Sequence, residues 1–216
     1  MRYKAILWDL DGTLLDTLQD LTDAVNVTLT THGFPTHSRE AVCGFVGNGI
    51  RSLIERALPP QSSPQTVETV LRDYNAYYAA HCNEATAPYA GILPLLQRLD
   101  AAGVRSAVVS NKSAYAVEPL VAQHFGQSIA LAVGVTAELP PKPDIAMVNN
   151  ALVQLGVAAA DALYIGDSEV DVHTARHAGM DGVFVSWGFR SKEQLRAAGA
   201  QVIYDTVADL EAALWE

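Results

Sequence analysis

The sequence predicts an α/β fold in which a parallel sheet carries helices on both faces and a helical block is inserted after the first strand. Short, nearly continuous apolar runs, typical of strands buried on both faces, alternate with segments whose apolar residues recur every three or four positions. The alternation breaks once, over residues 15–86, where helical patterns follow one another without a strand. We therefore expect a sheet core of residues 1–14 and 87–216 and a helical subdomain of residues 15–86.

The individual elements follow from these patterns. Six runs rich in Val, Ile, Leu and Ala are predicted to be strands: Ala5–Asp9, Arg105–Ser110, Leu131–Val135, Ala162–Asp167, Gly182–Ser186 and Gln201–Ile203. Amphipathic stripes predict core helices over residues 92–99, 145–155 and 207–214, with glycines at 103 and 156 as stop signals. Within the inserted block, stripes cover residues 14–29, 50–58 and 67–78.

Composition limits the classes of partner. The 216 residues carry 24 acidic and 14 basic side chains, a formal charge of −10, which argues against nucleic acid because such partners require a basic face. No apolar run approaches the ~18 residues of a membrane span, so a membrane partner is not expected. Cys43 and Cys82 lack metal-ligand spacing and are interpreted as reduced thiols of a cytoplasmic protein. Composition does not choose between a monomer and a homodimer.

The most informative segment, residues 9–14, reads DLDGTL and follows directly on the first predicted strand. Asp9 and Asp11 are two residues apart, so both lie on one side of an extended chain, roughly 7 Å from each other at a rise of ~3.3 Å per residue. Gly12 permits a sharp turn. The segment is either a strand-end turn with two solvated acids or a site for a metal ion or a phosphoryl group.

Three further polar segments also follow predicted strands. They are residues 110–112 (SNK), 141–143 (PKP) and 166–171 (GDSEVD). Because ligands of an open parallel sheet gather at the carboxyl ends of its strands, we expect all four segments to converge there. A hard cation would take the carboxylates of Asp9 and Asp167 and the backbone carbonyl of Asp11.

A phosphate group shared with that cation would also meet the hydroxyl of Ser110 and the ammonium of Lys142. Asp9 is then placed to attack phosphorus as the nucleophile, and Asp11 to protonate the leaving oxygen and later deprotonate water. Asp171 is expected to orient Lys142 or a water on the metal.

These four motifs, in this order, resemble the haloacid dehalogenase-like superfamily of phosphohydrolases, and the resemblance covers nearly the whole chain. The segments WDLDGTL, VGNGI, PYAG, SNK, AGM and WGF are most similar to its phosphoglycolate phosphatase group. The resemblance implies a Rossmann-like core with a helical cap, Mg²⁺ dependence, an aspartyl-phosphate intermediate and a small phosphorylated metabolite as substrate, with 2-phosphoglycolate first. Thr13 and Asn111 are further phosphate-binding candidates in these motifs.

Two features favour a phosphatase over other members of the superfamily. Dehalogenases lack the second Asp of the first motif, and phosphonate-cleaving members place a lysine in the cap, whereas residues 15–86 contain none. One departure is Ile145, where the family more often has a second proline in the third motif. A phosphomutase acting on a sugar phosphate and a non-catalytic regulatory or binding member remain the alternatives.

Two assignments are left open by the sequence. The glycine-rich turn of the cap places Gly47, Asn48 and Arg51 either against a substrate carboxylate or in a helix-entry turn with the arginine in solvent. Ser110 is a candidate helix N-cap as well as a phosphate ligand, because SNK is expected to end a strand and open a helix. Lys112 is then predicted to be a solvated lysine at the helix start rather than a ligand, and the sequence does not tell whether it touches substrate.

Overall fold

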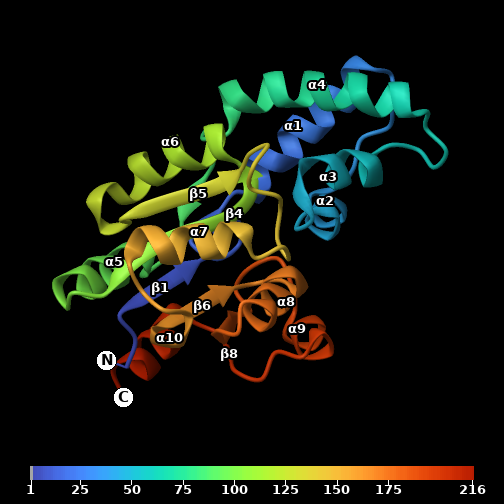
Figure 1. The fold of residues 1–216 in the computed structure, drawn as a ribbon. Helices are drawn as coiled ribbons and strands as arrows, with labels where there is room; N and C mark the ends of the chain where they lie inside the picture. The colour runs from blue at the N-terminus through green and yellow to red at the C-terminus, as the bar shows by residue number, and fades with distance from the viewer. Residues whose placement is uncertain (1) are drawn as a thin grey trace. The chain divides into compact units, whose positions relative to one another are not determined.

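The computed structural model describes residues 2–216 as two compact units (Figure 1). The sheet unit contains residues 2–15 and 88–216, and the helical unit is Asp16–Ala87. The predicted α/β class, with a parallel sheet and an inserted helical block, is confirmed. No helix among residues 2–216 is long and apolar enough to cross a membrane.

The sheet unit is built on six parallel strands in the order β5-β4-β1-β6-β7-β8. These strands are β1 (Ala5–Trp8), β4 (Arg105–Ser113), β5 (Leu131–Val135), β6 (Ala162–Gly166), β7 (Asp181–Val185) and β8 (Ile203–Tyr204). The unit's helices are α5 (Ile92–Ala101), α6 (Ala114–Phe125), α7 (Ala146–Leu155), α8 (Glu169–His177), α9 (Lys192–Ala198) and α10 (Val207–Trp215), with 3₁₀ turns η1 (Gly126–Ser128) and η2 (Ala159–Asp161).

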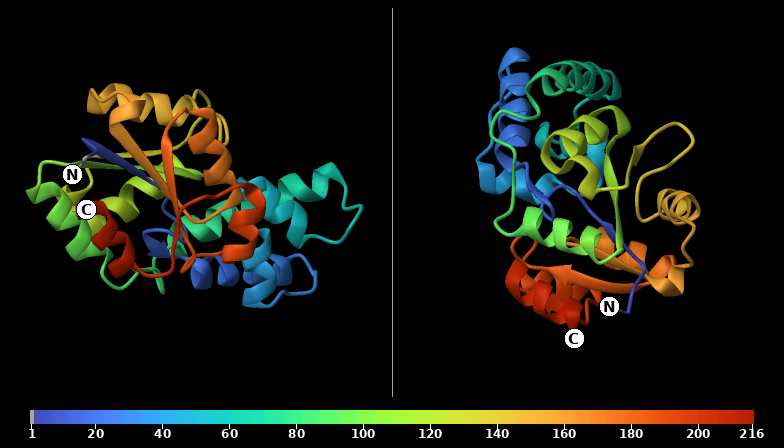
Figure 2. Two further views of the ribbon diagram at one scale, coloured as in Figure 1. Left: turned by 90° about the horizontal axis from the view of Figure 1, so that it is seen from below. Right: turned by 90° about the vertical axis from the view of Figure 1, so that its left-hand side faces the viewer.

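Helices cover both faces of this sheet (Figure 2). On one face, α7, α8 and α9 share an apolar cluster with alternate strand residues such as Leu7, Val109 and Tyr164. On the other face lie α5, α6 and α10, and an ion pair of 2.7 Å between Arg98 and Glu211 joins α5 to α10. Burial on both sides explains why every residue of β1 is apolar and has no exposed surface.

The direction of strand order reverses at β1, which pairs with β4 on one side and β6 on the other. In such sheets the crevice at the carboxyl ends of the central strands is the usual place for a ligand. The loops that begin at Asp9 and Asp167 open there. Strand β4 continues past its predicted end, and its register with β5 shifts between Val109 and Ser113.

The helical unit contains four helices: α1 (Leu18–Thr31), α2 (Arg39–Phe45), α3 (Gly49–Ala57) and α4 (Pro64–His81). Helix α2 was not predicted, because Val42 is its only buried residue and leaves no apolar stripe to detect. The carboxylate of the buried Asp20 on α1 accepts hydrogen bonds from the backbone N–H groups of Glu84, Ala85 and Thr86 and from the Thr86 hydroxyl. One side chain therefore fixes the segment that closes this unit.

The chain crosses between the two units at adjacent points. Strands β2 (Leu15–Asp16) and β3 (Ala87–Pro88) pair with each other as a separate two-stranded sheet. Next to them the backbone N–H of Tyr89 donates to the carbonyl of Leu14 at 3.1 Å. Two-residue strands are too short for a periodic signal, so the sequence did not reveal this pair.

Candidate active site

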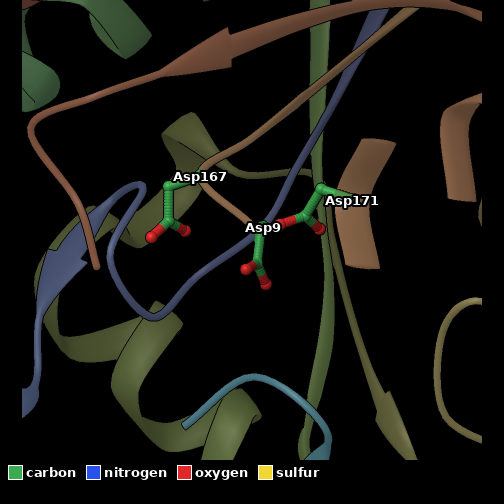
Figure 3. Close-up of side chains that lie close together, drawn as sticks. All are labelled: Asp9, Asp167 and Asp171. Atoms are coloured by element: carbon green, nitrogen blue, oxygen red, sulfur yellow. The ribbon is translucent and has the colours of Figure 1, made fainter. Parts of the chain in front are cut away.

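Three buried carboxylates meet at the carboxyl edge of the sheet. Asp9 follows β1, Asp167 follows β6, and Asp171 projects from the first turn of α8 (Figure 3). Each of them offers an oxygen, and these oxygens lie within 4.8 Å of one another. Buried like charges repel strongly, so this cluster requires cationic partners or bound protons.

Lys142 is the cation that contacts two of these carboxylates. Its Nζ lies 2.9 Å from Oδ1 of Asp9 and 2.8 Å from Oδ1 of Asp171, and its side chain is 2% exposed. The amide of Asn111 holds the backbone of this lysine from both sides, with Oδ1 accepting from the Lys142 N–H at 2.6 Å and Nδ2 donating to its carbonyl at 3.1 Å. The phosphate contacts predicted for Lys142 and Asn111 stay predictions, and the structure adds that Asn111 positions the lysine.

Asp171 is held by protein donors on both of its oxygens. Oδ1 accepts from Lys142 at 2.8 Å and from the hydroxyl of Tyr164 at 3.0 Å. Oδ2 accepts from the backbone N–H and the hydroxyl of Ser168, which forms a reciprocal capping box with Asp171 at the start of α8. These bonds favour the predicted role of Asp171 in orienting Lys142 over a role as a direct metal ligand.

Asp167 is held differently: within the described part of the chain, one donor reaches each of its oxygens. The Thr13 hydroxyl donates to Oδ1 at 2.9 Å, and the backbone N–H of Phe189 donates to Oδ2 at 2.7 Å. The Thr13 hydroxyl therefore donates its proton to Asp167. In this arrangement it cannot also donate a hydrogen bond to a phosphate, as the sequence predicted. A Cβ on Gly12 or Gly188 would collide with the Asp167 carboxylate, so both positions must lack a side chain.

The crowding of these acids shifts their protonation. Burial raises the pKa of Asp9 well above its ordinary value and the charge of Asp171 adds to the rise, against the opposing effect of Lys142. Burial, followed by the charge of Asp171, raises the pKa of Asp167 to about 7. Burial alone would lower the pKa of Lys142, but the carboxylates of Asp171 and Asp9 outweigh it and raise that pKa well above its ordinary value.

The residues present fit a hard divalent cation. Three buried carboxylates share the ammonium of Lys142, and the raised pKa values of Asp9 and Asp167 reflect the cost of holding so many negative charges together without a further cation. Asp9 and Asp167 contribute hard oxygen ligands of the kind that Mg²⁺ and similar ions take. The sequence predicts these two carboxylates, together with the backbone carbonyl of Asp11, as the metal ligands.

The prediction for Lys112 is wrong. Its side chain is 3% exposed, and its Nζ lies 3.1 Å from Oδ1 of Asp11, whose side chain is 15% exposed. The error comes from where the strand ends, because β4 continues through Lys112 and the N-cap of α6 is Ser113. Ser110 is therefore not a helix N-cap, and its buried hydroxyl accepts from the backbone N–H of Lys112 at 3.2 Å.

The three residues predicted in the helical unit have partners or constraints within that unit. Arg51 is half exposed and forms a 2.8 Å ion pair with Glu68 on α4. The side chain of Asn48 accepts from Arg56 at 2.7 Å. Gly47 has a positive φ of 124°, which a residue with a side chain rarely adopts. These observations explain the glycine-rich sequence structurally, and a contact with substrate stays a prediction for all three.

Sequence reasoning missed the residues that hold the acids in place. Tyr164, Ser168 and Phe189 all donate to Asp167 or Asp171. Tyr164 lies inside an apolar strand and resembles an ordinary core residue, so no sequence signal marks it. The Ser168-to-Asp171 spacing did carry a signal, because Ser followed three residues later by an acid is a capping-box pattern.

Known proteins resemble this chain over nearly its full length. The model of the haloacid dehalogenase-like hydrolase family matches residues 6–185. A phosphoglycolate phosphatase of Colwellia psychrerythraea is 34% identical, over 96% of this chain and 95% of its own length. The N-acetylmuramic acid 6-phosphate phosphatase of Pseudomonas aeruginosa is 33% identical, over 97% of this chain and 94% of its own length.

One solved structure has the same fold over nearly the whole chain. It is that of a proposed phosphoglycolate phosphatase from Lactobacillus delbrueckii subsp. bulgaricus, which is 38% identical with a TM-score of 0.96 and covers 99% of both chains. The likeness includes the helical insertion as well as the sheet, since nearly the whole chain is covered.

Proposed function

We propose, from the premise that this chain belongs to the haloacid dehalogenase-like hydrolases and is a phosphoric monoester hydrolase, that it hydrolyses 2-phosphoglycolate and similar small phosphate esters with Mg²⁺. The observation that carries the proposal is the contact of Lys142 with both Asp9 and Asp171. This ammonium is placed where a phosphate would bring its negative charge beside the Asp9 carboxylate. The names of the relatives supply the substrate.

The reaction proceeds by two in-line displacements. In the first, a carboxylate oxygen of Asp9 attacks phosphorus while Asp11 donates a proton to the departing alcohol oxygen. An aspartyl phosphate forms on Asp9 and the alcohol leaves. Oδ1 of Asp9 accepts from Lys142 and from the backbone N–H of Leu10 at 2.7 Å, which orients the carboxylate for attack.

In the second displacement, Asp11 takes a proton from water, the water oxygen attacks phosphorus, and the Asp9 carboxylate departs. Mg²⁺ held by Asp9, Asp167 and the Asp11 carbonyl would supply charge neutralisation for the phosphoryl oxygens. Thr13 and Phe189 keep Asp167 in place throughout. The helical unit is proposed to act as the cap that restricts access of water.

Steady-state phosphate release tests the proposal. The panel contains 2-phosphoglycolate, N-acetylmuramic acid 6-phosphate and a hexose phosphate, each with Mg²⁺ and with a chelator. We expect metal-dependent release that is fastest with 2-phosphoglycolate and is abolished in Asp9→Asn, a variant with unchanged circular dichroism. Release from Asp9→Asn at the wild-type rate would refute the mechanism, and preference for the muramic acid ester would replace the substrate.

The two alternatives make different predictions in the same assay. A phosphomutase would transfer phosphate between positions of a sugar phosphate and release little of it. A non-catalytic member would turn over no ester of the panel. A cytoplasmic location is also part of the proposal, and the two thiols Cys43 and Cys82, which form no disulfide, are compatible with a reducing compartment.

A further inference from the structure

One buried cation of the site has no role in the proposed mechanism. Lys112 lies in the site, and its ammonium is 3.1 Å from Oδ1 of Asp11, the proposed acid. Burying an ammonium costs free energy, and a lysine can usually avoid that cost because its long side chain carries the charge to water. A lysine kept at 3% exposure beside a catalytic carboxylate therefore indicates a function at that point.

The backbone around Lys112 is held in a fixed shape. The register of β4 with β5 shifts between Val109 and Ser113, so residues 110–112 bulge out of the ladder. A Cβ on Gly134 of β5 would lie only 2.8 Å from the Lys112 carbonyl, so the two strands touch there. The reciprocal bonds between Asn111 and Lys142 fix the neighbouring residue. The bulge thus fixes the backbone that carries Lys112, whose ammonium meets Asp11.

The position of Asp11 places Lys112 on the leaving-group side. Asp11 must come within a hydrogen bond of the ester oxygen that it protonates, and the Lys112 ammonium forms a 3.1 Å ion pair with Oδ1 of Asp11, so the ammonium lies within roughly 6 Å of that oxygen. A carboxyl carbon two covalent bonds from the ester oxygen is ~2.5 Å away from it. The carboxylate of such a substrate therefore falls within reach of Lys112.

We propose, resting on the phosphatase function above, that Lys112 binds a carboxylate carried on the carbon next to the ester oxygen and so selects α-carboxy phosphomonoesters. The three buried acids would otherwise repel such a substrate. The rival ligand, Arg51, is 51% exposed and already paired with Glu68. A buried ammonium discriminates charge better than an exposed guanidinium, because water screens the exposed group.

The test compares two esters that differ in the acid group. Wild type, Lys112→Met and Lys112→Arg are assayed with Mg²⁺ on 2-phosphoglycolate and on 2-hydroxyethyl phosphate, in which a hydroxymethyl group replaces the carboxylate. Loss of the contact with Asp11 lowers kcat/KM for both esters alike, so the readout is the ratio of the two values. We expect Lys112→Met to reduce this ratio by roughly 100-fold, chiefly through KM for 2-phosphoglycolate, and Lys112→Arg to retain most of it.

An equal loss on both esters would overturn the inference, since a merely structural lysine has that effect. It would also be overturned if Arg51→Met removed the ratio while Lys112→Met kept it. If the methionine variant does not fold, Lys112→Gln keeps a hydrogen-bond donor for Asp11 without the charge and gives the same readout. Wild type with no turnover of either ester would refute the phosphatase proposal, whereas turnover without preference for the acid would refute this inference alone.

Discussion

The ammonium of Lys142 lies 2.9 Å from Asp9, the proposed nucleophile, and the same ammonium also holds the buried carboxylate of Asp171 at 2.8 Å. Asp171 has no exposed surface and serves as a fixed anchor for the lysine. The arrangement couples stability to catalysis, because removing the lysine leaves two buried carboxylates without their cationic partner.

Lys142→Met is therefore expected to lower both properties. Breaking a buried ion pair typically costs about 3–5 kcal/mol of unfolding free energy, and losing a charge that stabilises a transition state costs roughly 10²–10³ in kcat. Urea unfolding and phosphate release measure the two effects.

Lys4→Met is the matched control for this substitution. Lys4 also forms a 2.8 Å ion pair, with Asp161, but the lysine side chain is 69% exposed. Its loss should change the unfolding free energy by less than about 1 kcal/mol and leave kcat unaltered. Similar effects for the two lysines would contradict the role of the buried ammonium.

Gly12→Ala is expected to damage the acid cluster. A Cβ at this position would collide with the carboxylate of Asp167, in addition to the strain of a positive φ of 86°. We expect stabilisation by Mg²⁺, measured as a shift in melting temperature, to be largely lost, and kcat/KM to fall by roughly 100-fold.

Gly103→Ala separates the collision from the strain. Gly103 has a comparable φ of 76°, but no atom lies within 4 Å of the point that a Cβ would occupy. Both variants should lose about 1–2 kcal/mol of stability from the left-handed backbone, and only Gly12→Ala should lose Mg²⁺ stabilisation and activity. Equal activity of the two variants would show that Asp167 does not need the open space.

Stabilisation by the metal should depend on pH through Asp167. Its pKa of about 7 lies above its value in the unfolded chain, so the stability it contributes without metal is present in acid and lost as the pH rises through 7. A cation binds the deprotonated carboxylate, so the shift in melting temperature produced by Mg²⁺ should grow from about pH 6 to about pH 8.

Asp167→Asn tests this assignment directly. The amide does not titrate near neutrality, so the variant should show a small Mg²⁺ shift whose growth over this interval falls to the part that Asp9 contributes, since the pKa of Asp9 is also raised. A metal shift in wild type that stays constant across the same interval would argue against Asp167 as the group that changes its protonation.

Asp20→Ala should loosen the end of the helical unit. The carboxylate of Asp20 accepts three backbone N–H groups and one hydroxyl from residues 84–86, and hydrogen bonds to a charged group contribute about 1.5–3 kcal/mol each in favourable cases. We expect a loss of at least about 2 kcal/mol in unfolding free energy and faster hydrogen exchange of the amides of residues 84–86.

Asp23→Ala on the same helix provides the comparison. Asp23 is exposed, and among residues 2–216 it accepts only from Gln19, four residues earlier. The stability of this variant should stay within about 0.5 kcal/mol of wild type. Unchanged exchange at residues 84–86 in the Asp20 variant would mean that other contacts hold this segment.

The sequence was informative where local patterns determine structure. Asp9 and Asp167 could be assigned to one edge because each directly follows an apolar run, and a parallel sheet places such ends together. The buried position of Lys112 could not be predicted. The bulge that prolongs β4 past Ser110 depends on contacts with β5, and it produces no periodic pattern of apolar residues in the sequence. The partner of Thr13, Asp167, lies 154 residues away and only the fold brings the two together.

The hydrogen bond between Tyr89 and Leu14 has a consequence for the evolution and engineering of this chain. The chain leaves the sheet unit and re-enters it at neighbouring residues. For the sheet unit, the whole helical unit is therefore equivalent to a loop that could be replaced. A short turn, or the corresponding segment of a relative, could join Leu15 to Pro88 without rethreading any strand of the six-stranded sheet. The residues proposed for phosphoryl transfer would stay in place. Any substrate selectivity that comes from the helical unit would be exchanged together with that unit.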